Sequence, residues 1–272
     1  MTEETGNSNG TDFDLDWNDK HVVPEVTYPD LDFFFERLRD ATLHAVNPRS
    51  GEAVLDVGCG RAIDAMSFAE KGGNCLGLEP PDTMICHAKR EVAKDGKGVA
   101  LLRGIGEYMP IKNHCFDKVV CKGALDHFPT PERAVQEMAR VVKPGGKVVI
   151  TVANLDSLGF RMGRTFFVRF RKLLRREESI FERIWQTPFD HTERFDYRSL
   201  KSMVGRHMKV DRCIGVSLFF ASPWWGMTLA KLPKPASRMI LRSLDGVARH
   251  MPALSDGVVV VCSLRTDGGK GL

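Results

Sequence analysis

A carboxylate and two glycines follow a short apolar run early in the chain. The segment from Ala53 to Gly60 reads AVLDVGCG, and it places Asp56, Gly58 and Gly60 where a strand-like pattern stops. Apolar residues then recur at helical spacing from Ala62 onward, which predicts a strand, a tight glycine turn and a helix. This arrangement is typical of a nucleotide pocket, because glycines let the backbone approach a ligand closely.

The residue types in this turn distinguish between two kinds of nucleotide. The dinucleotide pattern G-x-G-x-x-G needs a third glycine, and this chain has Ile63 there. A carboxylate at Asp56 would repel a pyrophosphate and attract a cation. S-adenosylmethionine has no phosphate and carries an ammonium and a sulfonium, so the pattern favours this cofactor. In the alternative, Asp56 has a structural role and accepts hydrogen bonds from the turn amides.

A second acid, Glu79, follows the glycine turn by about 20 residues, at the end of the next strand pattern. A carboxylate at this place can accept hydrogen bonds from both ribose hydroxyls. Because NAD pockets use the same device, Glu79 supports an adenosine ligand in general, whereas Asp56 and Ile63 favour the methionine-bearing one. The alternative is an exposed acid at a strand end.

The elements that must position these side chains alternate along the chain. Helical periodicity covers 31–46, about 62–72, about 81–93 and 130–142, and strand patterns cover 53–57, 74–80, 98–104, 117–121, 147–152, 207–218 and 257–264. Pro144, Gly145 and Gly146 are predicted to form the turn that leads into the fifth strand. Short links between strands and helices predict an α/β fold with a doubly wound, mostly parallel, seven-stranded Rossmann-like sheet. Two segments, about 154–197 and 219–256, break the alternation and are predicted to be helical cap insertions.

Composition predicts one globular domain without a disulfide or metal framework. The 272 residues are 43% hydrophobic, so 17–272 can form a single domain after a disordered acidic tail, 1–16. The net charge of +4 is too small to indicate nucleic acid. Seven scattered cysteines form no C-x-x-C pair, which argues against disulfides and structural zinc. No signal peptide or bilayer-length apolar run is present, so we expect a cytoplasmic protein.

Five ordered motifs resemble those of the class I S-adenosylmethionine-dependent methyltransferases, particularly the small-molecule branch with the generic methyltransferase domain 11. They are VLDVGCG (54–60), GLEP (77–80), RGIGEYMPIKNHCFDKVVC (103–121), ALDHFPTPERAVQEMARVVKPGGKVVI (124–150) and, more weakly, DHTERFDYRSLKSMV (190–204). The resemblance implies that Asp56, Gly58 and Gly60 line the methionine and ribose side of the cofactor, that Glu79 holds the ribose, and that Gly106 and Glu107 lie against adenine. Cys59, Pro80 and Lys122 are further candidates for cofactor binding, although relatives usually have a small polar residue where this chain has Lys122. Relatives commonly have an acid where this chain has Ile105, so adenine is expected to be held by backbone groups and by packing against Pro80 or Met109.

Three side chains beyond the glycine turn are candidates for acceptor chemistry or binding. His127 and His191 are candidate bases, since an imidazole titrates near neutral pH; packing or loop stabilisation is the alternative for His127. Lys122, after the fourth strand, could pair with the cofactor carboxylate or touch substrate. A solvated lysine is equally compatible with the sequence.

The two insertions carry basic and aromatic residues. Seven cations and no acid lie between Arg161 and Arg176, around apolar residues at helical spacing. This pattern predicts a lid helix with a solvated basic face, and the alternative is a helix that lies on a membrane surface. The aromatic residues of 218–235 could, with the first insertion, roof an apolar pocket; core packing is the alternative.

Together these patterns predict methyl transfer from S-adenosylmethionine to a small acceptor. An N/D-P-P-Y/F signature is absent after the fourth strand, which leaves O- or C-methylation of a lipophilic, anionic or glycosylated metabolite. No nucleic-acid partner is expected, whereas peripheral membrane contact stays open. Two alternatives are a nicotinamide-dependent oxidoreductase and a non-catalytic cofactor-binding, membrane-associated scaffold.

Overall fold

The computed structural model describes residues 28–80, 82–96, 98–174, 193–220, 222 and 224–265, with side chains at 167–174 excluded. The predicted acidic tail, the predicted start of the domain at Trp17 and the second histidine candidate, His191, all lie outside this range. The same is true of the predicted basic face beyond Phe166. These expectations stay predictions.

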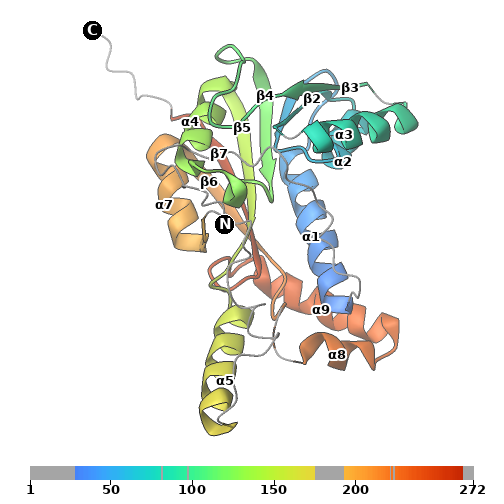
Figure 1. Ribbon diagram of the computed structural model, residues 1–272, viewed down its shortest axis with the longest axis vertical. Helices are drawn as coiled ribbons and strands as arrows, with labels where there is room; N and C mark the ends of the chain where they lie inside the picture. Colours follow the sequence, from blue (N-terminus) through green and yellow to red (C-terminus); the bar gives the residue numbers. More distant parts are fainter. Residues whose placement is uncertain are drawn as a thin grey trace, which may run out of the picture.

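The fold is built on a seven-stranded sheet in the order β3-β2-β1-β4-β5-β7-β6 (Figure 1). The strands are β1 (Ala53–Val57), β2 (Asn74–Glu79), β3 (Val99–Arg103), β4 (Phe116–Lys122), β5 (Val142–Ala153), β6 (Lys209–Val216) and β7 (Gly257–Ser263). All neighbours are parallel except that β7 runs antiparallel to β5 and β6. The prediction of a mostly parallel, doubly wound sheet is confirmed.

Helices cover both faces of this sheet, as the alternation predicted. On one face α1 (Pro29–Val46), α2 (Ile63–Glu70) and α3 (Asp82–Asp95) contribute Phe34, Phe68 and Ala88 to a buried cluster. On the other face α4 (Pro131–Val141) and α7 (Tyr197–His207) contribute Met138 and Leu200. The strands between them are buried on both faces, which explains the run of four valines in β7.

One expected boundary was wrong. The sequence predicted that Pro144, Gly145 and Gly146 form a turn before the fifth strand, but β5 already begins at Val142. Val142 pairs with Phe116, and the register then shifts before Lys118 pairs with Lys147. The shift accommodates Pro144, which has no amide hydrogen to donate, within an irregular part of the ladder.

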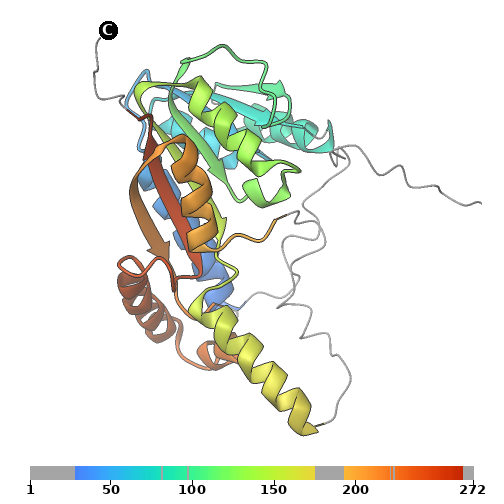
Figure 2. The ribbon, with the colours of Figure 1, turned by 90° about the vertical axis from the view of Figure 1, so that its left-hand side faces the viewer.

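The carboxyl ends of β1, β2, β4, β5 and β6 lie at one edge of the sheet, and both insertions leave from this edge. The first insertion contains α5 (Leu158–Leu174), and the second contains α8 (Trp225–Ala230) and α9 (Lys234–Ala248). Figures 1 and 2 show these three helices at the end of the molecule opposite α3, with α5 projecting away from the body. Among the described residues, no helix combines the length and apolarity needed to cross a bilayer.

Candidate functional site

The turn between β1 and α2 depends on its two glycines. Gly58 and Gly60 have φ of 71° and 53°, a left-handed conformation that disfavours side chains. The amide of Gly58 donates a hydrogen bond to the carbonyl of Leu78, at 2.8 Å, which ties the turn to the end of β2. A Cβ atom at Gly58 would collide with the side chain of Ala124. The turn therefore fits tightly between the ends of β2 and β4.

Glu79 lies against this turn rather than at an exposed strand end. Its side chain is buried, and its Oε2 accepts a hydrogen bond of 2.8 Å from the amide of Gly60. Burial raises the pKa of Glu79 from 4.5 to about 7, opposed by the Gly60 hydrogen bond and by the nearby charge of His127. The carboxylate is thus fixed at the carboxyl edge but poorly solvated there.

Asp56 is the most strongly perturbed acid of the site. Burial raises its pKa from 3.8 to about 8, and the negative charges of Asp64 and Glu79 add to this rise. Lys122 opposes the rise, because its positive charge lies close by. A ligand cation beside Asp56 and Glu79 would favour their ionised forms, so this acid pair fits the sulfonium and ammonium of S-adenosylmethionine.

Asp64 is a member of this charge cluster that sequence reasoning missed. It stands in the first turn of α2, and its Oδ2 lies 2.8 Å from the Nζ of Lys122. Its side chain is also within ion-pair distance of Arg39 in α1. The only signal for it in the sequence was its position, four residues after Gly60 at the predicted start of a helix. Lys122 is therefore anchored by a protein carboxylate, and its contact with the cofactor stays a prediction.

A groove of about 420 Å³ continues from Glu79 along the ends of β2 and β3. It is lined by Pro80, Arg103, Gly104, Ile105, Tyr108 and Pro110. Ile105 contributes an apolar wall here instead of an acid, and Tyr108 offers an aromatic ring that the sequence did not single out. This groove has the character expected for packing an adenine ring between apolar side chains. Met109, by contrast, is not among the lining residues.

The other predicted cofactor residues support the backbone around the groove. Glu107 is buried, and its carboxylate accepts a hydrogen bond of 3.2 Å from the amide of Thr130. A Cβ atom at Gly106 would come within 2.9 Å of the Phe128 ring. The thiol of Cys59 is buried, which raises its pKa. These contacts show structural roles, while direct cofactor contact at the three residues stays a prediction.

His127 ends a 3-10 helix, Leu125–His127, directly after β4. Its side chain is half-buried, and its charge lowers the pKa of Glu79, so the imidazole lies within electrostatic reach of that carboxylate. His127 therefore belongs to the cluster at the carboxyl edge. In the described part of the chain, no group of three or more metal-ligating side chains could hold a metal ion.

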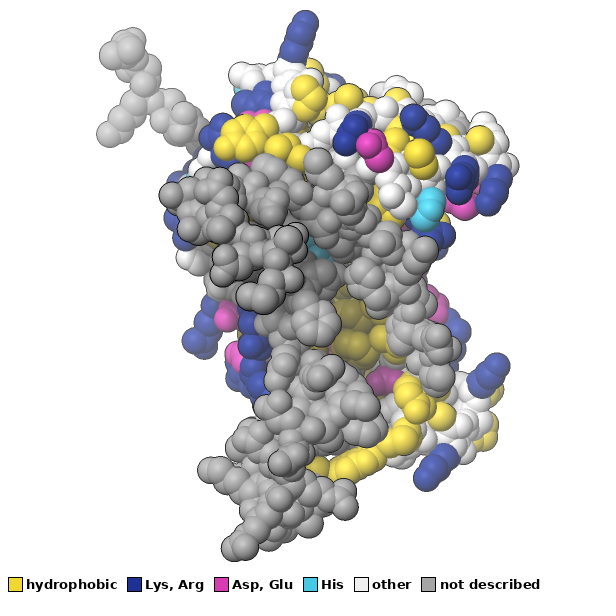
Figure 3. All heavy atoms as spheres, in the orientation of Figure 1, with side chains coloured by type: hydrophobic (Ala, Val, Ile, Leu, Met, Phe, Trp, Pro, Cys, Tyr) yellow, Lys and Arg dark blue, Asp and Glu magenta, His cyan; other side chains and the backbone are white. Residues whose placement is uncertain are grey.

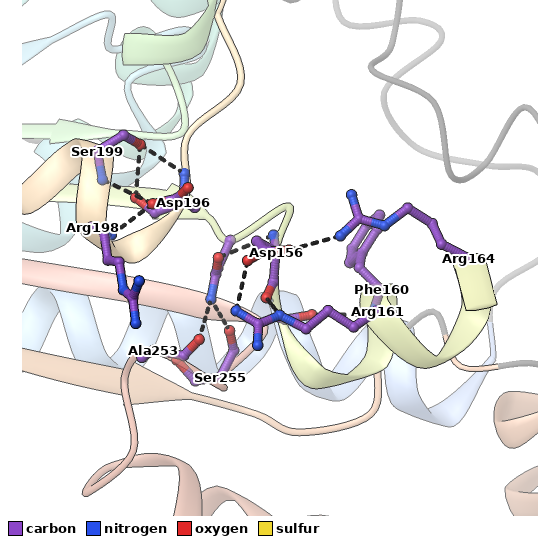
Figure 4. Close-up of polar contacts among 11 residues, drawn as sticks. Asp156, Phe160, Arg161, Arg164, Asp196, Arg198, Ser199, Ala253 and Ser255 are labelled. Carbon is purple, nitrogen blue, oxygen red and sulfur yellow. Dashed lines mark hydrogen bonds and ion pairs between the residues drawn. The ribbon is translucent and has the colours of Figure 1, made fainter.

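The start of the first insertion is fixed to the same edge by the residues around Asp156. Arg161 and Arg164 of α5 both donate to its carboxylate, at 2.6 and 2.7 Å, and Asn154 donates to the carbonyl of Ser255 at 2.7 Å (Figure 4). Asp196 caps α7 nearby through the amides of the next turn. Two of the cations predicted for a free basic face are thus paired with an acid.

Comparison with known proteins identifies the part of the chain that contains the glycine turn, Glu79 and His127. Residues 55–150 match a methyltransferase domain family, Methyltransf_11. The chain is 32% identical over 137 residues to a demethylmenaquinone methyltransferase of Bacillus cereus, covering 48% of this chain and 58% of the relative. It is 34% identical over 133 residues to a ubiquinone biosynthesis O-methyltransferase of Citrobacter koseri, covering 44% and 55%. The match thus spans little more than half the length of these relatives.

A solved structure extends the likeness to the fold of most of the chain. A SAM-dependent methyltransferase from Thermotoga maritima superposes with a TM-score of 0.55 and 16% identity, covering 86% of this chain and 90% of the other. At this identity the likeness concerns the fold alone.

Proposed function

Because the chain carries a class I S-adenosylmethionine-dependent methyltransferase domain, we propose that the protein transfers a methyl group from this cofactor to a small-molecule acceptor. The observation that carries the proposal is the pair of buried acids, Asp56 and Glu79, on either side of the glycine turn. A ligand cation would stabilise the ionised forms of both buried acids, whereas a ligand anion would be repelled by them, so the pair favours a cationic ligand.

The residues present fit this cofactor. Glu79 would accept hydrogen bonds from the ribose, and Asp56 with the Gly58–Gly60 turn would hold the methionine portion. Ile105, Tyr108 and Pro80 would pack on adenine. When bound, the cofactor supplies an electrophilic methyl group. The protein contributes position and exclusion of water, which matter because an in-line transfer neutralises charge.

The acceptor is proposed to be lipophilic, methylated at oxygen or carbon. Two relatives are named for demethylmenaquinone and ubiquinone biosynthesis, and this supports an acceptor with an apolar body and an acidic enol or phenol. His127 is the candidate base for such a hydroxyl, because it lies near Glu79 at the end of β4. His191 stays a second candidate.

Two other functions make different predictions for binding. A nicotinamide oxidoreductase would bind NADH, whose pyrophosphate would lie against Asp56 and Ile63; the acid pair disfavours this ligand. A non-catalytic scaffold would bind the cofactor without turnover.

Calorimetry with S-adenosylmethionine, S-adenosylhomocysteine and NADH tests the cofactor assignment. We expect the first two to bind. Asp56→Asn should weaken binding of S-adenosylmethionine more than binding of S-adenosylhomocysteine, which keeps the ammonium but lacks the sulfonium charge. Transfer of a labelled methyl group to lipophilic phenols then separates enzyme from scaffold. Binding of NADH alone would refute the proposal.

A further inference from the structure

The lobe formed by α8 and α9 has two different faces. Its inner face packs on α1, where Leu229 and Leu241 join Phe33 in a buried cluster. Gly226 lies so close to Asp30 of α1, and to Tyr28 just before that helix, that a side chain there would not fit. The lobe is therefore held to the body of the molecule by specific contacts.

The outer face exposes large apolar side chains. Trp224 is 53% exposed, Met227 41%, and Met239 65%. Met239 lies two residues from both Ser237 and Leu241, which are buried, so it points away from the inner face of its helix. Three large apolar side chains exposed on one small lobe are unusual for a surface that contacts only water.

Charge on this lobe is almost all positive. Residues 218–251 contain five Lys and Arg and a single acid, Asp245. Asp245 is buried and pairs with Arg37 and Arg249, while Arg238 pairs with Glu36 of α1. Among the described residues, no carboxylate lies within ion-pair distance of the other three cations, Lys231, Lys234 and Arg242. Figure 3 shows basic side chains at the rim of the apolar band on this lobe.

The lobe also stands next to the carboxyl edge of the sheet. α8 follows β6 from that edge, and the ring of Trp224 contacts Phe166 of α5 edge-on, with centroids 4.9 Å apart. The same edge carries Asp56, Glu79 and Lys122. A surface touched by this lobe would therefore lie on the acceptor side of the cofactor residues.

We propose that the outer face of α8 and α9 docks the protein on an anionic lipid bilayer, with Trp224, Met227 and Met239 in the interface and Lys231, Lys234 and Arg242 on the headgroups. Apolar side chains with an aromatic anchor and a rim of unpaired cations are the chemistry that such an interface binds. The inference places the membrane contact on the second insertion rather than on the first. Only the role of this contact, which is to give access to a lipophilic acceptor, rests on the proposed function.

Vesicle co-sedimentation of the full chain tests this surface. We expect binding to phosphatidylcholine vesicles that contain phosphatidylglycerol, and little binding to phosphatidylcholine alone. Replacing Lys231, Lys234 and Arg242 by Gln should lower the partition coefficient on the order of 100-fold, from about fivefold per cation. The double variant Met227→Ser with Met239→Ser should lower it about tenfold without a change in charge.

The matched control replaces three exposed cations at the opposite end, Lys89, Arg90 and Lys112, by Gln. This control variant loses the same net charge, but its partition coefficient should change less than about threefold. Equal losses for both triple variants would overturn the proposal, because the attraction would then be a property of net charge. Absence of binding by the parent chain would also overturn it, as would self-association through this face in sedimentation analysis without vesicle binding.

Failure of this inference and failure of the proposed function give different results. Vesicle binding is measured without cofactor or acceptor, and cofactor binding is measured by calorimetry without lipid. Both triple variants should keep the parent's cofactor affinity and thermal unfolding.

Discussion

Replacing Glu79 by Gln should change how the stability of the cofactor-free protein depends on pH. Burial raises the folded-state pKa of Glu79 to about 7, above its unfolded value of 4.5. The folded protein therefore binds the proton more tightly, and its free energy of unfolding falls as pH rises from about 4.5 to about 7. Gln does not titrate, so the variant lacks this fall.

The expected size follows from the pKa difference. Between pH 5 and pH 8.5 the parent should lose about 2.5 kcal/mol that the variant retains, since one pKa unit corresponds to about 1.36 kcal/mol. The side chain is only 5% exposed, so solvent screening reduces the value little. Urea unfolding followed by circular dichroism at the two pH values gives the difference directly.

A second buried glutamate serves as the control. Glu137 pairs with Arg140, at 2.6 Å, and accepts a hydrogen bond from Met109, which lowers its pKa. Its titration lies below pH 4.5, so Glu137→Gln should destabilise the protein equally at pH 5 and pH 8.5. If Glu79→Gln behaves like Glu137→Gln, the carboxylate of Glu79 is well solvated and our account of the site is wrong. Glu79→Gln should also weaken binding of S-adenosylmethionine by about 1 to 3 kcal/mol, measured by calorimetry.

Three further changes test other parts of the structure. Gly58→Ala should lower the free energy of unfolding by about 3 kcal/mol, because the new Cβ atom would collide with Ala124. Gly96 has a similar φ of 69° but open space around it, so Gly96→Ala should cost about 1 kcal/mol in the same urea assay. Lys122→Gln and Asp64→Asn should show a coupling of about 1 kcal/mol in a double-mutant cycle, and additive effects would contradict the ion pair. Asp256→Asn should gain stability over the parent as pH rises from about 4 to about 7, because burial raises the pKa of Asp256 to about 7; parallel stability curves would exclude that shift.

The sheet was predictable because the composition of its strands differs from that of the segments between them. β1 and β7 are short apolar runs between glycine-rich or polar segments, and a strand buried on both faces needs such a run. The glycine turn was predictable for a related reason, since only glycine fits the close approach to the ends of β2 and β4. The error at β5 arose because Pro144 and Gly145 resemble a turn, whereas the ladder absorbs them through a shift in register.

The site was less predictable because its charges interact across the chain. Asp64 lies eight residues after Asp56 on a different element, and only the fold brings it to Lys122 from the end of β4. Tyr108 was a loop residue in the sequence, and it became part of the groove because the segment after β3 passes beside Pro80. Periodicity identifies which face of an element is buried, but it carries no information on which distant side chain meets it.

The buried acids at the carboxyl edge divide into two kinds, and the division separates ligand binding from structure. Asp56 and Glu79 have raised pKa values, and Glu79 accepts a hydrogen bond from the amide of Gly60 in the glycine turn. Asp256 also has a raised pKa, but its Oδ2 accepts a hydrogen bond of 2.9 Å from the amide of Phe220, and its backbone carbonyl accepts one of 2.8 Å from the amide of Asn154.

Asp256 thereby joins the start of β7 to both insertions, because Asn154 precedes α5 and Phe220 precedes α8. The first kind of acid gains from a ligand cation, whereas the second holds the backbone where the insertions begin. The position of the proposed membrane face thus depends on a carboxylate at the same edge that would hold the cofactor.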